Sequence, residues 1–151
     1  MNFIENIDSK DFLCKCGCKK GEGMISPDLL SLLQKFQDFI NLPIVINSGF
    51  RCPEYNKRID GAENSLHLTG EAVDISILAT LGNGSKYWLS GPEILKLLHK
   101  SGVCFGGIGV GGTYLHLDTR KTPDFWFYGD VLKWSDSSVY YKKSYTGHLD
   151  F

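Results

Sequence analysis

The sequence lacks a strong excess of charge of either sign. It has 16 lysine and arginine residues against 17 aspartate and glutamate residues, which leaves a formal net charge of -1 at pH 7. Proteins that bind nucleic acid or an anionic membrane surface usually carry a basic patch or stripe. We therefore expect neither a nucleic acid nor a membrane as the partner of this chain.

Long apolar runs are missing as well. No segment approaches the roughly 20 apolar residues that a helix needs to span a bilayer. The first ten residues include Glu5 and Asp8 and hold no apolar core, unlike a signal peptide. These features predict a chain that is synthesised in the cytoplasm without a signal peptide.

The cysteines do not form the even set that a disulfide framework requires. There are five of them: Cys14, Cys16, Cys18, Cys52 and Cys104. Ordinary zinc knuckles space their ligands as C-x2-C, whereas residues 14–18 alternate as C-x-C-x-C. We expect reduced thiols in a tight turn around Gly17, and a structural zinc ion is the alternative.

The length and composition fit one globular domain. The chain has 151 residues, of which 42% are hydrophobic and 13% aromatic, enough for a single core. We predict one domain over 1–151, with its core at about 12–127. Residues 128–151 then form a C-terminal extension, and its role stays open between packing, covering a cleft and attachment.

Besides a short helix that starts at Pro53 and ends near Gly61, two longer helices and a buried strand are predicted in the body of the chain. Ser26 is a good N-cap and Pro27 suits the first helical position. An apolar stripe at helical spacing follows, formed by Leu29, Leu30, Leu33, Phe36, Phe39 and Ile40. Residues 44–46 are typical of a short buried strand, and a second helix is expected at 92–100, ended by Gly102.

Two further segments alternate with the period of a half-buried strand. In the first, Val73, Ile75 and Ile77 share one face. In the second, Leu115 and Leu117 do so. The residues between them face the other way on each strand, so pairing of the two strands would bring their polar side chains together.

The polar faces of these strands carry candidate metal ligands. Asp74 lies on the first strand and His116 on the second, while His67 lies just upstream, before the turn-former Gly70. Two imidazoles and one carboxylate suit zinc and leave a fourth tetrahedral position open. Spacing alone also permits ordinary surface or core histidines, because the helical H-E-x-x-H signature is absent.

Several separated motifs resemble one family. Residues 48–56 read SGFRCPEYN, and residues 61–74 read GAENSLHLTGEAVD. Together they resemble the S-G-[YF]-R…N…G-A…S-x-H-x-x-G-x-A-x-D pattern of the zinc D-Ala-D-Ala carboxypeptidase-like metallopeptidases. Residues 106–120, GGIGVGGTYLHLDTR, followed by Trp126, are similar to the second half of that pattern. The resemblance covers roughly residues 12–127.

The resemblance implies a fold, a metal and an activity. The group includes bacterial peptidoglycan carboxypeptidases, phage endolysins and the hedgehog signalling domain. The implied fold is a small α+β domain, a mainly antiparallel sheet with helices packed on it. We expect one Zn²⁺ per chain on His67, Asp74 and His116.

The implied activity is hydrolysis of peptidoglycan stem peptides, as a D,D-carboxypeptidase or an endopeptidase. A phage or prophage lysis enzyme, released to the cell wall by a separate pore, would suit this small form. The alternative is a non-catalytic zinc-containing domain of the same fold, for cell-wall binding or structure. The oligomeric state is not predicted.

The resemblance also implies roles around the metal. The family's matching arginine points into the active site, so Arg51 is expected to bind substrate or to stabilise a developing oxyanion. A guanidinium suits this because it stays charged and presents its donors in a fixed fork. Ser65 is expected to help position the substrate or a metal ligand, unless it is a turn residue.

The general base is the point of departure from the family pattern. Many members carry Glu or Asp three residues before the last histidine ligand, where this chain has Thr113. Asp118, on the same strand face as His116, is the candidate that takes its place as a catalytic residue. Alternatively, Asp118 orients His116 or pairs with Arg120. Two further candidates for the base are Glu63 and Glu71.

Overall fold

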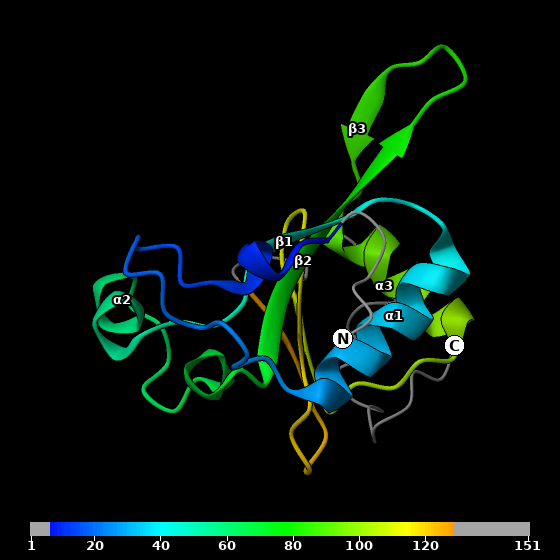
Figure 1. The fold of residues 1–151 in the computed structure, drawn as a ribbon. Helices are drawn as coiled ribbons and strands as arrows, with labels where there is room; N and C mark the ends of the chain where they lie inside the picture. The colour runs from blue at the N-terminus through cyan, green and yellow to red at the C-terminus, as the bar shows by residue number, and fades with distance from the viewer. Residues whose placement is uncertain (1–6, 129–151) are drawn as a thin grey trace.

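The computed structural model describes residues 7–128, and the extension predicted for 128–151 lies almost entirely outside them. A central sheet carries two helices on one side and one shorter helix on the other (Figure 1). The helical elements are η1 Ser9–Phe12, α1 Pro27–Ile40, α2 Pro53–Arg58, η2 Leu66–Thr69 and α3 Gly91–Ser101. Within the described range, no helix is long and apolar enough to cross a membrane.

The sheet is mixed, and most of its pairings are antiparallel. Its strands are β1 Ile44–Ser48, β2 Ala72–Thr80, β3 Lys86–Trp88, β4 Gly107–Val110, β5 Leu115–Asp118 and β6 Asp124–Phe127. Their order is β1-β2-β5-β4-β6, with β3 paired to β2, and only the described pair β4/β6 is parallel. This arrangement confirms the predicted α+β class.

The helix boundaries follow the signals in the sequence. The Ser26 hydroxyl accepts a hydrogen bond from the Leu29 amide at 3.4 Å, and Pro27 opens α1. Gly102 ends α3 with a left-handed φ of 71°, a conformation that glycine adopts without steric cost. The predicted helix ranges therefore agree with α1 and α3 to within about a residue.

One apolar core holds the helices to the sheet. From α1 and α3 come the fully buried residues Leu29, Leu33, Phe36, Ile94, Leu95 and Leu98, and from β2 and β5 come Ile75, Ile77, Leu115 and Leu117. The inward-facing residues of both strands are thus fixed in the core. Because side chains alternate along a strand, the residues between them are held on the opposite face of the sheet.

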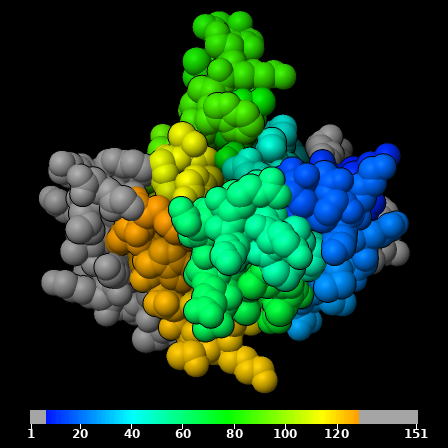
Figure 2. Space-filling model, turned by 90° about the vertical axis from the view of Figure 1, so that its left-hand side faces the viewer, coloured from blue at the N-terminus to red at the C-terminus, as the bar shows by residue number. Residues whose placement is uncertain are grey.

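The opposite face carries irregular segments. On the side of the molecule seen in Figure 2, the green segment around α2 and η2 lies between the blue N-terminal residues and the orange strand β6. The turn at residues 82–85 joins β2 to β3, and this hairpin projects from the body (Figure 1). The face under α2 and η2 is where the polar residues of β2 and β5 emerge.

Candidate metal centre and active site

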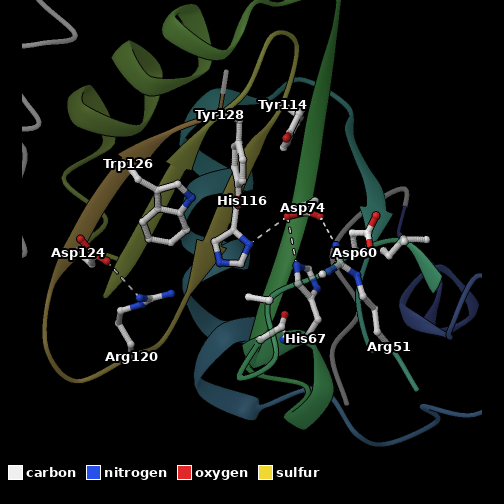
Figure 3. Close-up of a pocket in the computed structure, with 14 residues that line it drawn as sticks. Arg51, Asp60, His67, Asp74, Tyr114, His116, Arg120, Asp124, Trp126 and Tyr128 are labelled. Atoms are coloured by element: carbon white, nitrogen blue, oxygen red, sulfur yellow. Dashed lines mark hydrogen bonds and ion pairs between the residues drawn. The ribbon is translucent and has the colours of Figure 1, made fainter. Parts of the chain in front are cut away.

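Three predicted ligands meet on this face of the sheet. Asp74 of β2 and His116 of β5 are direct partners in the antiparallel register. His67 comes from η2, which folds over the start of β2 (Figure 3). One ligand atom from each of the three residues lies within 4.8 Å of the others. The His67 and His116 residues are only 1% and 5% exposed, so the protein holds them in place.

One carboxylate oxygen lies at the centre of this group. Asp74 Oδ1 is 3.2 Å from His67 Nε2 and 3.1 Å from His116 Nδ1. The two imidazole rings meet edge to face, with their centroids 5.1 Å apart. A small ion between the three side chains would therefore be reached by two nitrogens and one oxygen at once.

The outer nitrogen of each imidazole is hydrogen-bonded to the protein. His67 Nδ1 donates to the carbonyl oxygen of Gly49 at 2.7 Å. His116 Nε2 donates to Asp118 Oδ2 at 2.8 Å. In a neutral imidazole with its proton on the outer nitrogen, the inner nitrogen carries a lone pair. The bonds thus turn two lone pairs toward Asp74.

This donor set fits a metal cation. Two lone pairs that face a carboxylate oxygen at hydrogen-bond distance repel it unless a proton or a metal ion lies between them. Metal-binding histidines commonly donate their other N–H to a carbonyl or carboxylate, as His67 and His116 do here. Three such ligands with an open position are typical of catalytic zinc sites.

The pKa shifts of Asp74 and His116 indicate the same need for a positive charge at this centre. Burial disfavours the Asp74 anion, but hydrogen bonds from His116 and His67 outweigh it and hold the Asp74 pKa well below its usual range. Burial lowers the pKa of His116, yet Asp118 and Asp74 overcome this and raise it above the ordinary value. Both shifts favour a positive charge beside Asp74, which a bound metal ion would supply.

Arg51 is fixed beside the candidate metal ligands. Its Nη2 donates to Asp74 Oδ2 at 3.0 Å, its Nε to the Ser48 hydroxyl at 3.0 Å and its Nη1 to Asn56 Oδ1 at 3.3 Å. Asp74 thus offers one oxygen to the histidines and the other to Arg51. The guanidinium also lines the adjoining cavity, where a bound substrate would meet a positive charge held in one orientation.

Asp118 lies behind His116, away from Asp74. It is 0% exposed, and besides His116 it accepts from Arg120 Nη2 at 2.6 Å, from Arg120 Nε at 2.9 Å and from the Arg120 amide at 3.0 Å. Burial opposes its charge, but His116 and Arg120 hold the Asp118 pKa well below its usual range. This geometry favours the second role predicted for Asp118, that of orienting His116.

Ser65 has a local role that the structure makes clear. Its hydroxyl accepts from the His67 amide at 3.3 Å as the N-cap of η2, and the residue also lines the cavity. It therefore helps to set the backbone from which His67 projects. Glu63 and Glu71 are not among the residues that line the described cavity.

A cavity of about 440 Å³ opens beside the three ligands. Besides the residues already named, its lining includes Asp60, Tyr114, Arg120, Asp124, Trp126 and Tyr128 (Figure 3). Asp60, Tyr114 and Tyr128 were not among the predicted site residues. Asp60 precedes Gly61 in a turn, and each tyrosine lies next to the end of a strand. Residues in such positions are common on protein surfaces, so their sequence context did not mark them as part of a functional site.

The two tyrosines present protonated hydroxyl groups to the cavity. Burial, and the nearby charge of Asp74, raise the pKa of Tyr114. Burial raises the pKa of Tyr128 to about 12, against the effect of a hydrogen bond from Trp126. Both phenols therefore keep their protons at neutral pH and can donate to an oxygen of a bound substrate.

Gly107 provides the space for the buried carboxylate of Asp118. It pairs with Asp118 across β4 and β5, and a Cβ at this position would collide with both carboxylate oxygens and with Arg120 Nε. Gly107→Ala is expected to lower the free energy of unfolding by about 1–3 kcal/mol, the usual cost of overpacking. Denaturant unfolding measures this, with Gly82→Ala as control, because a Cβ at Gly82 meets nothing within 4 Å. Equal stability of the two variants would contradict the assigned packing.

Comparison with known proteins identifies the family. No curated protein matches the sequence. Among solved structures, the L-Ala D-Glu endopeptidase ChiX of Serratia marcescens is similar, with 19% identity and a TM-score of 0.40 over 63% of this chain and 74% of that one. The family model for peptidase M15 matches residues 5–118, most of the chain. The protein that carries this centre therefore belongs to the peptidase M15 family.

Proposed function

We propose that the protein is a zinc-dependent peptidase that hydrolyses the stem peptides of peptidoglycan, as a carboxypeptidase or an endopeptidase. The observation that carries the proposal is the convergence of His67, Asp74 and His116 beside an open cavity, with the outer nitrogen of each imidazole hydrogen-bonded to an oxygen acceptor. Membership of the peptidase M15 family supports the reaction class. The family-like motifs around Arg51 and His67 support the substrate class.

The residues around the centre suit the cleavage of an amide bond. Zinc held by the three ligands supplies Lewis acidity, which polarises a carbonyl and acidifies water. Arg51 is held so that its positive charge can bind a substrate carboxylate or the oxygen that becomes negative as the carbonyl is attacked. Tyr114 and Tyr128, both protonated, donate hydrogen bonds to the same substrate.

Among the carboxylates that line the cavity, Asp60 is the best placed to act as the general base. Three carboxylates line the cavity: Asp74 is bound to Arg51, and Asp124 pairs with Arg120 at 3.4 Å. Asp60 is exposed, and no ion-pair partner lies against it within residues 7–128. In our proposal Asp60 takes the proton of the attacking water, directly or through a second water, and Asp118 acts only through His116.

Asp118→Asn is expected to weaken zinc binding more than turnover. The amide still fits behind His116 but removes the charge that orients the ring, and loss of such a partner typically costs about 10- to 100-fold in metal affinity or activity. Turnover at saturating zinc should stay near wild type. Zinc titration and peptide hydrolysis measure the two effects separately.

Asp60→Asn is the matched variant for the same question. It should leave the zinc affinity unchanged and lower kcat by about 10²- to 10⁴-fold, the usual contribution of general base catalysis. If Asp118→Asn instead abolishes turnover in the zinc-loaded protein, while Asp60→Asn is active, Asp118 is the base and our assignment is wrong.

Digestion of defined muropeptides tests the function itself. The zinc-loaded protein should release either D-Ala or a new stem-peptide end, each identified by mass spectrometry, and a chelator should suppress it. Release of D-Ala identifies a carboxypeptidase, and an internal cut identifies an endopeptidase. Intact peptides with fully loaded protein would favour the rival function, a zinc-containing binding domain, to which Thr113 at the usual base position also points.

A further inference from the structure

A second group of ligands lies outside the metal centre. The thiols of four cysteines converge: Cys14, Cys16, Cys18 and Cys52. All four sulfur atoms lie within 4.8 Å of one another, and all four thiols are free. The first three belong to one turn near the N-terminus, and the fourth precedes α2, so the fold rather than local sequence brings them together.

The sulfur spacing fits a single tetrahedral ion. Zinc–sulfur bonds of about 2.3 Å place the sulfurs of a tetrahedral site about 3.8 Å apart. The Cys14 and Cys16 sulfurs are 3.4 Å apart, and those of Cys16 and Cys52 are 3.7 Å apart. A disulfide would bring one pair to about 2.05 Å and leave the other two thiols without this geometry.

Two backbone amides donate hydrogen bonds to sulfurs of this group. The Cys52 amide donates to the Cys14 sulfur at 3.3 Å, and the Tyr55 amide donates to the Cys52 sulfur at 3.4 Å. Hydrogen-bond donors of this kind stabilise a thiolate, which is the form of cysteine that binds metals. The protein thus supplies partners to the two buried sulfurs of the group.

The backbone of the turn directs the side chains of Cys14, Cys16 and Cys18 toward one another. Gly17 and Lys19 have left-handed φ angles of 88° and 61°, and the Cys14 amide closes the turn on the Lys20 carbonyl at 2.9 Å. These reversals let cysteines at alternate positions share one side of the turn. Cys14 and Cys18 also have three residues between them, which lies within the spacing used by structural zinc sites.

We propose that Cys14, Cys16, Cys18 and Cys52 bind a structural zinc ion. Four thiolates form a closed, soft ligand set that favours zinc and leaves no position for substrate. The ion would fasten the N-terminal turn to the segment before α2, which contains Arg51 and the Gly49 carbonyl. The sequence favoured reduced thiols without metal, because residues 14–18 do not follow the C-x2-C spacing of zinc knuckles. This inference does not depend on the peptidase activity.

Metal analysis of matched cysteine variants tests the proposal. The intact protein, purified with reductant, should hold about two zinc ions per chain, one for each site. Cys52→Ser should hold about one. Cys18→Ser, which changes the exposed member of the group, is the second variant in case the buried substitution prevents folding. Cys104→Ser changes an exposed cysteine outside the group and should keep both ions.

Cobalt substitution separates the two sites by their ligands. Thiolate-bound Co²⁺ absorbs in the near ultraviolet through sulfur-to-metal charge transfer, whereas a site of two histidines and one carboxylate does not. The bands should be present in the intact protein and in His116→Ala, and lost in Cys52→Ser. About one zinc per chain in both the intact protein and the cysteine variants would overturn the proposal. Iron in place of zinc, or a disulfide found by mass spectrometry without reductant, would overturn it too.

Discussion

His116→Ala is expected to abolish peptide hydrolysis. The substitution removes one of three ligands and leaves a carboxylate and a single imidazole, too few to hold a catalytic zinc ion tightly. It also removes the N–H group that donates a hydrogen bond to Asp118 at 2.8 Å. The buried carboxylate then keeps Arg120 as its one described hydrogen-bond partner. Turnover should fall to the level of the chelated protein. Muropeptide hydrolysis and metal content, measured on the same preparation, check this.

His99→Ala is the control for this variant. His99 lies in the last turn of α3 and is not among the residues that line the cavity. Its substitution should preserve the metal and the turnover. Circular dichroism establishes that both variants are folded before activities are compared. Hydrolysis by folded His116→Ala at more than a small fraction of the wild-type rate would contradict the assigned ligand set.

Arg51→Lys is expected to lower kcat by about 10²- to 10³-fold, the usual effect of losing one donor to a developing oxyanion. Lysine keeps the charge but not the fork that contacts Ser48, Asn56 and Asp74 together. If Arg51 binds a substrate carboxylate equally well in the ground state and in the transition state, Arg51→Lys should raise KM with little change in kcat. Steady-state kinetics with zinc-loaded protein distinguish the two roles.

Arg58→Lys provides the comparison for this prediction. Arg58 is also an arginine of this region, at the end of α2, where it stacks over Tyr55 and does not line the cavity. Its replacement should leave kcat and KM unchanged. Zinc content must be measured for Arg51→Lys as well, because Arg51 contacts Asp74, a proposed metal ligand. Wild-type kinetics in Arg51→Lys would show that the guanidinium has no specific role in the reaction.

The sequence predicted those features that depend on local physics. Ser26 and Pro27 mark the start of α1 because an N-cap and a first-turn proline act on their own backbone. Alternation within 72–77 and 115–118 assigns each residue to a face of its strand. Since both apolar faces must be buried, Asp74 and His116 were already placed on the same side of the sheet.

Other features depend on contacts between remote segments, and local patterns carry no signal for them. Cys52 joins the turn at 14–18 only because the sheet places α2 beside the N-terminal segment. Asp118 shares a strand face with His116, as predicted, but the direction of the ring and the closeness of Arg120 decide what it does. Asp60 lies in an ordinary turn, and only the cavity distinguishes it from other exposed carboxylates.

Zinc titration of the metal-free protein, with turnover followed on the same samples, tests the central claim most directly. Residues 67, 74 and 116 form the proposed catalytic site, so muropeptide hydrolysis should be absent without zinc and should rise as this site fills. Titration of Cys52→Ser in parallel removes the contribution of the second proposed site. Full turnover in zinc-free protein, or none in zinc-loaded protein, would contradict the account.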